Sequence, residues 1–172
     1  PWSVCAADLD TVPGLDLAAV SFNSNTVAIL KNNGDGTFAS KVDYPTASGP
    51  RSVTRSDLDG DGDQDLAVVN LGGAPWHGGN TVSVFKNNGN GTFAPQVDYG
   101  TGGLNPMSVV ACDLDADGDQ DLAVANFGNN APFRDNNLSV LQNNGDGTFA
   151  SPVTYETGNQ PTSVICSDLD GD

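Results

Sequence analysis

Basic residues and glutamate are scarce in this chain. Six lysines and arginines stand against 22 acidic residues, and the formal net charge is -16. Glu156 is the only glutamate, so almost every acidic residue is an aspartate. Because phosphate groups are bound by clusters of Lys and Arg, this balance excludes a typical nucleic-acid-binding protein. A surface that served only solubility would mix Asp with Glu, so the bias predicts a local role for aspartate in loops.

Long apolar runs are absent as well. No segment approaches the roughly 18 consecutive apolar residues that a membrane-spanning helix needs. The opening residues Pro1 to Ser3 lack the basic start and the apolar run of a signal peptide. No window shows helical periodicity. With 21 glycines and 10 prolines among 172 residues, the composition favours short strands joined by tight turns.

Cysteine and histidine are also rare. The three cysteines Cys5, Cys112 and Cys166 match no zinc-binding spacing, and an odd number cannot all pair within the chain. We expect small buried residues in strands, with one disulfide and a free thiol as the alternative. His77 has no nucleophile motif nearby, and a catalytic histidine needs a nucleophile and an orienting partner. The sequence therefore predicts that this segment is not an enzyme.

Three motifs recur along the chain in a fixed order. The first is an aspartate-rich segment, found at Asp57–Asp65, Asp113–Asp121, in a degenerate form at Asp8–Asp16 and in a shortened form from Asp168. The second is the stretch Asn-Asn-Gly-x-Gly-Thr-Phe, which begins at Asn32, Asn87 and Asn143. The third is Pro-x-Ser-Val, which begins at Pro1, Pro50, Pro106 and Pro161. We infer one repeat region over 1-172, with repeats at about 1–49, 50–105, 106–160 and a partial repeat at 161–172.

Each repeat contains short segments with the pattern of β-strands. In the third repeat, residues 108–112 lead into the aspartate segment, 122–126 leave it, 138–142 alternate apolar and polar side chains, and 153–155 end the repeat. The Asn-Gly-Asp-Gly stretch tolerates positive φ and predicts a hairpin turn. Repeats of this size suit propeller blades. We predict an all-β fold of β-propeller-type four-stranded antiparallel blades, with three full repeats and the start of a fourth, as a partial propeller or an open repeat array. The partial repeat from Pro161 would supply an inner strand.

The spacing of the aspartates predicts metal binding. The complete copies read Asp-x-Asp-x-Asp-Gly-x-x-Asp, and a loop that curls around a cation places alternate side chains inward. Short Asp side chains, with Gly62 or Gly118 at the sharp turn, form the oxygen-rich cage that Ca²⁺ prefers. Mg²⁺ demands a tighter octahedron, and Zn²⁺ favours Cys and His. Carboxylates within about 4–6 Å would repel one another without a cation. The alternative is a polar turn without metal.

We assign one Ca²⁺ to each complete loop. The side-chain ligands would be Asp57, Asp59, Asp61 and Asp65 in one loop and Asp113, Asp115, Asp117 and Asp121 in the other. Backbone carbonyls would come from Asp63 and Asp119. The loop is not an EF-hand, because the flanks are strands and Val68 and Val124 replace the bidentate glutamate.

The two incomplete copies predict weaker sites. The first copy keeps Asp8, Asp10 and Asp16, but Val12 stands at the fifth position and Pro13 replaces the glycine. Calcium binding there is therefore expected to be weaker. The last copy keeps Asp168, Asp170 and Asp172.

Together, the aspartate loops and the Asn-Gly-Asp-Gly-Thr-Phe turns resemble the FG-GAP-like, or VCBS, repeat over essentially the whole chain. Similar repeats build the propeller of integrin α-subunits and of some fungal lectins. The resemblance implies calcium in the loop between the first and second strands of a blade, an extracellular or cell-surface location, and roles in adhesion or carbohydrate binding. Such propellers usually contain more blades than the three full repeats of this chain.

Two functions follow as hypotheses. The first is a calcium-stabilised extracellular module for adhesion or for binding carbohydrate or protein. Because aromatic side chains on loops can stack on sugars, the candidate ligand contacts are those of the two longest loops, Trp76, His77, Phe133 and Arg134. The alternative is a scaffold or filament subunit that self-associates through its incomplete ends, or that is completed by further blades of a longer chain. The sequons at Asn90 and Asn137 permit glycosylation in a secreted protein.

Overall fold

The structure is a computed structural model of the 172-residue chain and describes residues 1–73, 77–129 and 136–169. These residues form three four-stranded sheets, and in each sheet the strand order follows the chain order. The first sheet contains β1 (Ser3–Ala7), β2 (Asp16–Ser21), β3 (Thr26–Leu30) and β4 (Val42–Pro45). The second contains β5 (Pro50–Ser56), β6 (Asp65–Gly73), β7 (His77–Phe85) and β8 (Val97–Gly100). The third contains β9 (Pro106–Cys112), β10 (Asp121–Asn126), β11 (Asn137–Leu141) and β12 (Val153–Glu156).

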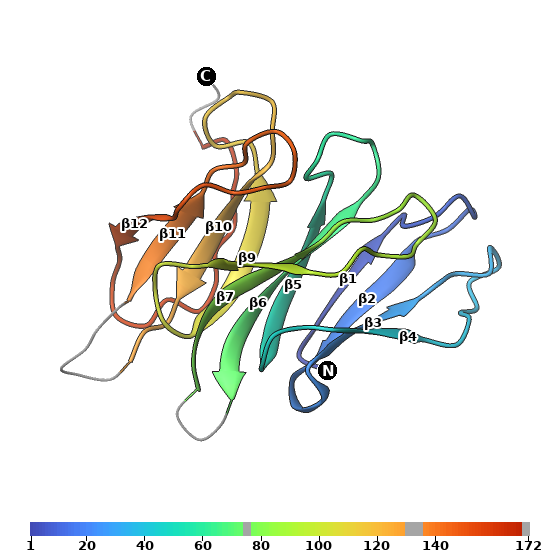
Figure 1. The fold of residues 1–172 in the computed structure, drawn as a ribbon, viewed down its shortest axis with the longest axis horizontal. Helices are drawn as coiled ribbons and strands as arrows, with labels where there is room; N and C mark the ends of the chain where they lie inside the picture. The colour runs from blue at the N-terminus through green and yellow to red at the C-terminus, as the bar shows by residue number, and fades with distance from the viewer. Residues whose placement is uncertain (74–76, 130–135, 170–172) are drawn as a thin grey trace.

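Every neighbouring pair of strands is antiparallel, which confirms the predicted four-stranded antiparallel blades. A short 3-10 turn, η1 (Phe22–Ser24), joins β2 to β3. The three blades lie side by side, and the connections between their first and second strands share one edge of the array (Figure 1). No helix of the described segments is long and apolar enough to cross a membrane.

The blades are held together by apolar residues that alternate between the two faces of each sheet. In β6, Leu66 and Val68 belong to the core between the first and second blades, whereas Ala67 and Val69 belong to the core between the second and third. Successive side chains of a strand point to opposite faces, so a strand buried on both faces serves both cores. A single blade cannot bury its own faces, and stacking therefore creates the fold.

An aromatic contact repeats at each seam between blades. Tyr44 of β4 packs edge-on against Phe93 of the next blade, with the ring centres 5.4 Å apart, and Tyr99 packs in the same way against Phe149 at 5.3 Å. Tyr155 occupies the corresponding position in the third blade and is 53% exposed. In the first two blades this tyrosine packs against the following blade, whereas in the third blade it lies exposed on the outer face.

A second repeated contact joins the hairpin turn of one blade to the aspartate segment of the preceding blade. The side-chain amide of Asn87 donates to the carbonyl oxygens of Leu9 and Gln64, at 3.0 and 3.1 Å. Asn143 repeats this contact one blade further along, donating to Leu58 at 2.7 Å and to Gln120 at 3.0 Å. These bonds satisfy buried carbonyl groups and fix the position of each blade on its neighbour.

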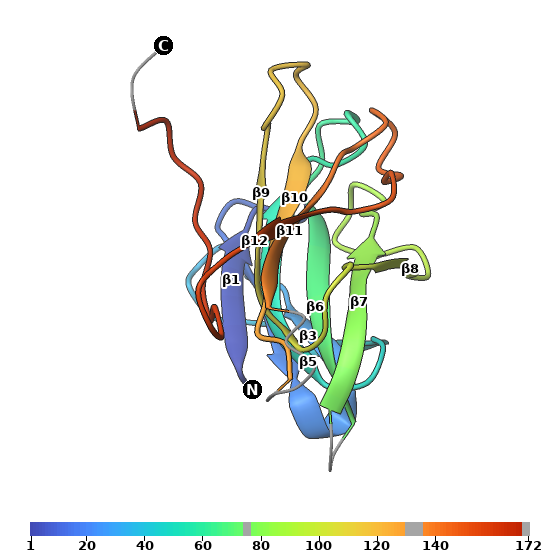
Figure 2. The same ribbon diagram turned by 90° about the vertical axis from the view of Figure 1, so that its left-hand side faces the viewer.

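The described part of the fourth repeat, residues 161–169, contains no strand, so the expected inner strand is absent there. Its backbone still runs beside β9, where the N–H of Val164 donates to the Ser108 hydroxyl oxygen at 3.3 Å (Figure 2). A strand requires a hydrogen-bonded ladder, and no described second strand of that repeat is present to form one.

The cysteines follow the sequence expectation only in part. Cys5 in β1 and Cys112 in β9 are partly buried, but Cys166 is exposed and lies outside any strand, so its expected burial is wrong. All three are free thiols. Burial raises the pKa of the Cys5 thiol to about 11, which makes it a poor nucleophile near neutral pH.

The seam bond of Asn143 yields a stability prediction. Asn143→Ala would leave the buried carbonyls of Leu58 and Gln120 without this donor, and we expect the free energy of unfolding to fall by about 2–4 kcal/mol. Asn144→Ala is the matched control, because Asn144 is exposed and its side-chain amide donates to the exposed Thr148 hydroxyl. Urea denaturation of both variants measures the difference. Equal destabilisation by the two substitutions would contradict the assigned role of Asn143.

Candidate metal centre

The two complete aspartate loops connect the first and second strands of the second and third blades. Asp57 curls its loop by accepting the N–H groups of Gly60 and Gly62, at 2.8 and 3.0 Å. Gly62 has φ of 95°, and its counterpart Gly118 has φ of 99°, a left-handed region that other residues rarely adopt. The glycine of the motif therefore permits the sharp turn, as the sequence predicts.

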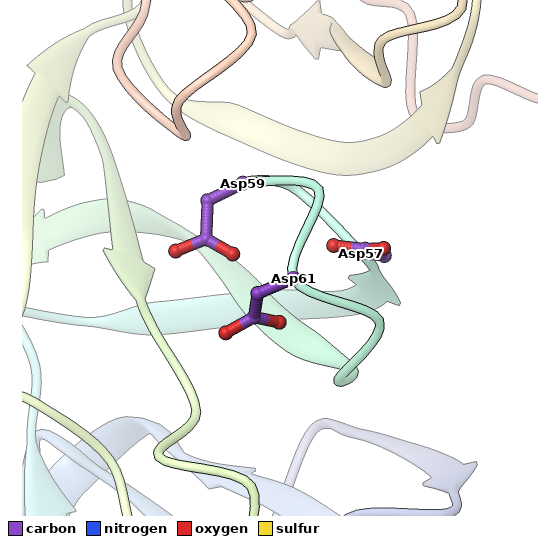
Figure 3. A group of neighbouring side chains, drawn as sticks. All are labelled: Asp57, Asp59 and Asp61. Carbon is purple, nitrogen blue, oxygen red and sulfur yellow. The ribbon is translucent and has the colours of Figure 1, made fainter.

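This curl brings three carboxylates of each loop together. Oxygen atoms of Asp57, Asp59 and Asp61 lie within 4.8 Å of one another, and all three side chains extend from one short segment (Figure 3). The same distance holds for Asp113, Asp115 and Asp117. The first, third and fifth positions of the motif are thus gathered in both complete loops. The ligand role of the backbone carbonyl groups of Asp63 and Asp119 stays a prediction.

The aspartate at the ninth position of the motif has a structural role that the sequence did not indicate. Asp65 is fully buried, and its carboxylate accepts the backbone N–H of Leu58 at 3.0 Å and of Asn87 at 2.8 Å. Asp16 and Asp121 accept the two equivalent N–H groups. This aspartate therefore ties the loop to the second strand and to the hairpin turn. Each carboxylate oxygen has a second lone pair, so these bonds are compatible with ligation of a cation.

The electrostatics of the loops reflect crowded carboxylates. Burial raises the pKa of Asp65 to about 6; the hydrogen bonds from Asn87 and Leu58 oppose this rise, and the charges of Asp59 and Asp61 add to it. In the other loop, loss of hydration raises the pKa of Asp115, and nearby Asp117 and Asp121 raise it further. A bound cation would offset this repulsion.

One atom gives an independent test of whether a cation fits. Asp59 Oδ1 is buried, and no described residue provides it with a hydrogen-bond partner. A buried charged oxygen without a partner is costly, and coordination of a hard cation satisfies it. The donor set consists entirely of carboxylate oxygens, which Ca²⁺ prefers over the nitrogen and sulfur ligands of zinc sites. The residues of this loop therefore fit calcium.

The degenerate loop is arranged differently. Among the described residues, no group of three metal-compatible side chains forms at Asp8, Asp10 and Asp16. Asp10 instead accepts the N–H of Val12 at 2.8 Å and pairs with Lys31 at 3.4 Å. In the last copy, Asp168 is exposed, and Asp170 and Asp172 lie outside the described residues.

Two further side chains touch the complete loops. Lys86 Nζ lies 3.3 Å from Asp59 Oδ2, and Gln142 Nε2 donates to Asp115 Oδ2 at 2.9 Å. Sequence analysis did not identify them, since each lies far along the chain from its partner. Both residues directly precede a repeated Asn-Asn turn, and this shared position is the sequence signal that could have identified them.

The ligand contacts that the sequence suggests stay a prediction. Trp76, Phe133 and Arg134 lie outside the described residues, and His77 is the first residue of β7, where its backbone pairs with Gly73. The structure instead shows an apolar pocket of about 300 Å³, at the end of the sheets opposite the aspartate loops. It is lined by Trp2, Arg51, Leu71, Asn105, Met107 and Phe127.

Within this pocket, the Arg51 guanidinium lies over the Trp2 ring, 3.8 Å from its centre. Burial lowers the pKa of Arg51. Three of the lining residues, Trp2, Arg51 and Met107, directly follow the prolines of the Pro-x-Ser-Val motif, which is the sequence signal that could have identified them.

Similarity to solved structures extends over most of the chain. A lectin from Agrocybe aegerita, described as recognising non-reducing terminal N-acetylglucosamine, shares 29% identity at a TM-score of 0.57. The alignment covers 86% of this chain and 36% of the lectin, so the chain spans about a third of that protein. A Photorhabdus luminescens Tc holotoxin pore gives 26% identity and a TM-score of 0.47, over 85% of this chain and 7% of the toxin chain. No curated protein sequence matches the chain.

The family model for the FG-GAP-like repeat matches three consecutive segments, residues 14–68, 57–124 and 113–172. The matches follow one another along nearly the entire chain, and each contains at least one of the aspartate segments. The chain belongs to the FG-GAP-like repeat family.

Proposed function

We propose that the chain is a calcium-stabilised extracellular repeat module that binds carbohydrate or protein, rather than an enzyme. One observation carries the calcium part of the proposal. Asp57, Asp59 and Asp61 converge within 4.8 Å, and a buried oxygen of Asp59 lacks a hydrogen-bond partner in the described structure. A cation at this point would offset the repulsion and satisfy that oxygen.

Calcium would stabilise the folded state of the chain. Asp57, Asp59 and Asp61 would hold one ion and Asp113, Asp115 and Asp117 a second, with Asp65 and Asp121 behind them at the start of the second strands. An ion that binds only the folded loop adds its binding free energy to the stability of the fold. Extracellular modules commonly bind calcium at about 10⁻⁴–10⁻³ M, so this mechanism suits a protein that works outside the cell.

Two observations support carbohydrate as the ligand. The similar lectin is described as recognising terminal N-acetylglucosamine. The apolar pocket presents the aromatic rings of Trp2 and Phe127 together with the guanidinium of Arg51. Sugar rings stack their apolar faces on aromatic side chains, while nearby polar groups bond the hydroxyls.

A scaffold role is the second candidate, and it would use the outer face of the third blade. Leu58 is 2% exposed beneath the next blade, but its counterpart Leu114 is 45% exposed. Tyr155 is likewise uncovered. A further repeat, from this or another chain, would cover both residues as the third blade covers the second. Concentration-dependent sedimentation together with an absence of glycan binding would favour this scaffold over the binding module.

Chelation tests the proposed role of calcium in stability. At a calcium concentration ten times the Kd, each ion adds about 1.4 kcal/mol. We therefore expect excess chelator to lower the melting temperature by roughly 5–10 °C, and calcium, but not magnesium, to restore it. Differential scanning calorimetry gives the measurement. A melting curve that chelator leaves unchanged would refute the proposal.

The inequality of the loops gives a second test. Asp59→Ala and Asp115→Ala each remove one carboxylate from a three-carboxylate group, so each variant should bind one ion fewer than the parent. Asp10→Ala should leave the calcium content unchanged, because Asp10 belongs to no such group and pairs with Lys31. Equilibrium dialysis with elemental analysis counts the ions. Equal calcium loss in all three variants would show that the first loop is a site like the others.

Glycan binding is tested at the apolar pocket. We expect the protein to select N-acetylglucosamine-terminated glycans on an array, and Trp2→Ala to weaken binding by at least about tenfold through loss of a stacking surface. Trp76→Ala tests the residue that the sequence suggested. Val97→Ala is the control, because Val97 is equally exposed but lies on β8, outside the pocket. If no glycan binds, or if Val97→Ala weakens binding as much as Trp2→Ala does, the pocket is not the binding site.

A further inference from the structure

A lysine lies against the complete loop of the second blade. Lys86 Nζ is 3.3 Å from Asp59 Oδ2, while the second oxygen of this carboxylate, Oδ1, is buried without a hydrogen-bond partner among the described residues. The two oxygens of this carboxylate therefore differ. Oδ2 is paired with an ammonium group, whereas Oδ1 has free lone pairs that a metal ion would use.

The next blade holds this lysine in place. Lys86 Nζ also donates to the backbone carbonyl of Asp146, in the hairpin turn of the third blade. Gly147 in that turn packs so closely that an added Cβ would lie 2.8 Å from Lys86 Cε and 3.0 Å from Asp59 Cβ. The lysine thus lies between its own loop and the neighbouring turn, with its side chain 38% exposed, and the bond to Asp146 holds the ammonium group near Asp59.

The other two repeats form a natural comparison. In the first repeat, Lys31 occupies the same position, pairs with Asp10 at 3.4 Å and donates to the carbonyl of Asn90 in the next turn. In the third repeat, the residue is Gln142, which contributes an uncharged amide to Asp115 at 2.9 Å. The residue before each Asn-Asn turn therefore contacts the aspartate at the third position of every loop, but it carries a positive charge in only two of the three repeats.

We propose that this position sets the calcium affinity of each loop, with Lys86 acting as an internal counter-ion that competes with calcium for Asp59. The inference rests on the proposed calcium binding. An ammonium group partly neutralises the loop when it is free of metal, reduces the net negative charge that attracts Ca²⁺, and repels the ion once it is bound. Gln142 satisfies Asp115 without any of these effects, so the loop of the third blade keeps the larger attraction for calcium.

Exchange of the two residues tests the proposal, with each site measured alone. In an Asp115→Ala background, which leaves the loop of the second blade, Lys86→Gln should lower the calcium Kd by about tenfold. In an Asp59→Ala background, which leaves the loop of the third blade, Gln142→Lys should raise the Kd by about tenfold. Isothermal titration calorimetry with calcium chloride measures both values. Because each variant is compared with its own parent, the greater exposure of the loop of the third blade does not affect the comparison.

Lys41→Gln is the matched control. It removes the same charge, but Lys41 pairs with Asp43 on β4, away from the loops, so the calcium Kd should change less than about twofold. Lys86→Met, which keeps the stem packed against Gly147 and removes only the charge, should tighten binding as Lys86→Gln does. If the Lys86 variants fail to fold, Gln142→Lys on the exposed third loop still decides.

The outcomes separate this inference from the proposed function. Absence of calcium binding in both single-loop parents would overturn the calcium site itself and, with it, the inference. Calcium binding in the parents with an unchanged Kd in Lys86→Gln and Gln142→Lys, or with a change no larger than that of Lys41→Gln, would overturn the inference alone.

Discussion

Leu58 lies between Asp57 and Asp59 in the chain, and the rest of the seam depends on its burial. Its side chain is 2% exposed in the core between the second and third blades, and its carbonyl accepts the amide of Asn143. Because this leucine is fixed beneath the third blade, the aspartates on either side are fixed with it. The acidic loop is therefore part of the packing between blades, and the charges of the loop bear directly on how firmly neighbouring repeats hold together.

Three kinds of contact would stabilise the negative charges of the aspartate loops. The aspartate at the ninth position of each loop accepts two backbone N–H groups, which stabilise its carboxylate in a buried position. Lys86 neutralises part of the loop of the second blade at 3.3 Å from Asp59. The remaining carboxylates, and the unpartnered Asp59 Oδ1, match the ligands that calcium uses in proteins. Under this account, calcium and the lysine are alternative counter-charges for one carboxylate, and the turn of the next blade keeps the lysine close to it.

Much of the fold follows from the sequence because its signals are local and repeated. The alternation of 138–142 predicts a strand, and β11 forms at Asn137–Leu141; the Asp-x-Asp-x-Asp-Gly spacing predicts convergent carboxylates, and Asp57, Asp59 and Asp61 converge. Contacts between repeats are harder to predict. The pairing of Lys86 with Asp59 and the pocket around Trp2 join segments that only the stacking of blades brings together. The missing inner strand at 161–169 has the same cause, since a ladder depends on a partner strand that local pattern does not supply.

Anomalous diffraction at long wavelength, from crystals grown with calcium, would show whether the aspartate loops are calcium sites between stacked blades. The proposed calcium binding predicts one anomalous peak among the carboxylates of Asp57, Asp59 and Asp61 and one among those of Asp113, Asp115 and Asp117, with no equally strong peak at Asp8, Asp10 and Asp16. A map with no peak at either complete loop, from crystals whose calcium concentration exceeds the roughly millimolar range of extracellular modules, would contradict it.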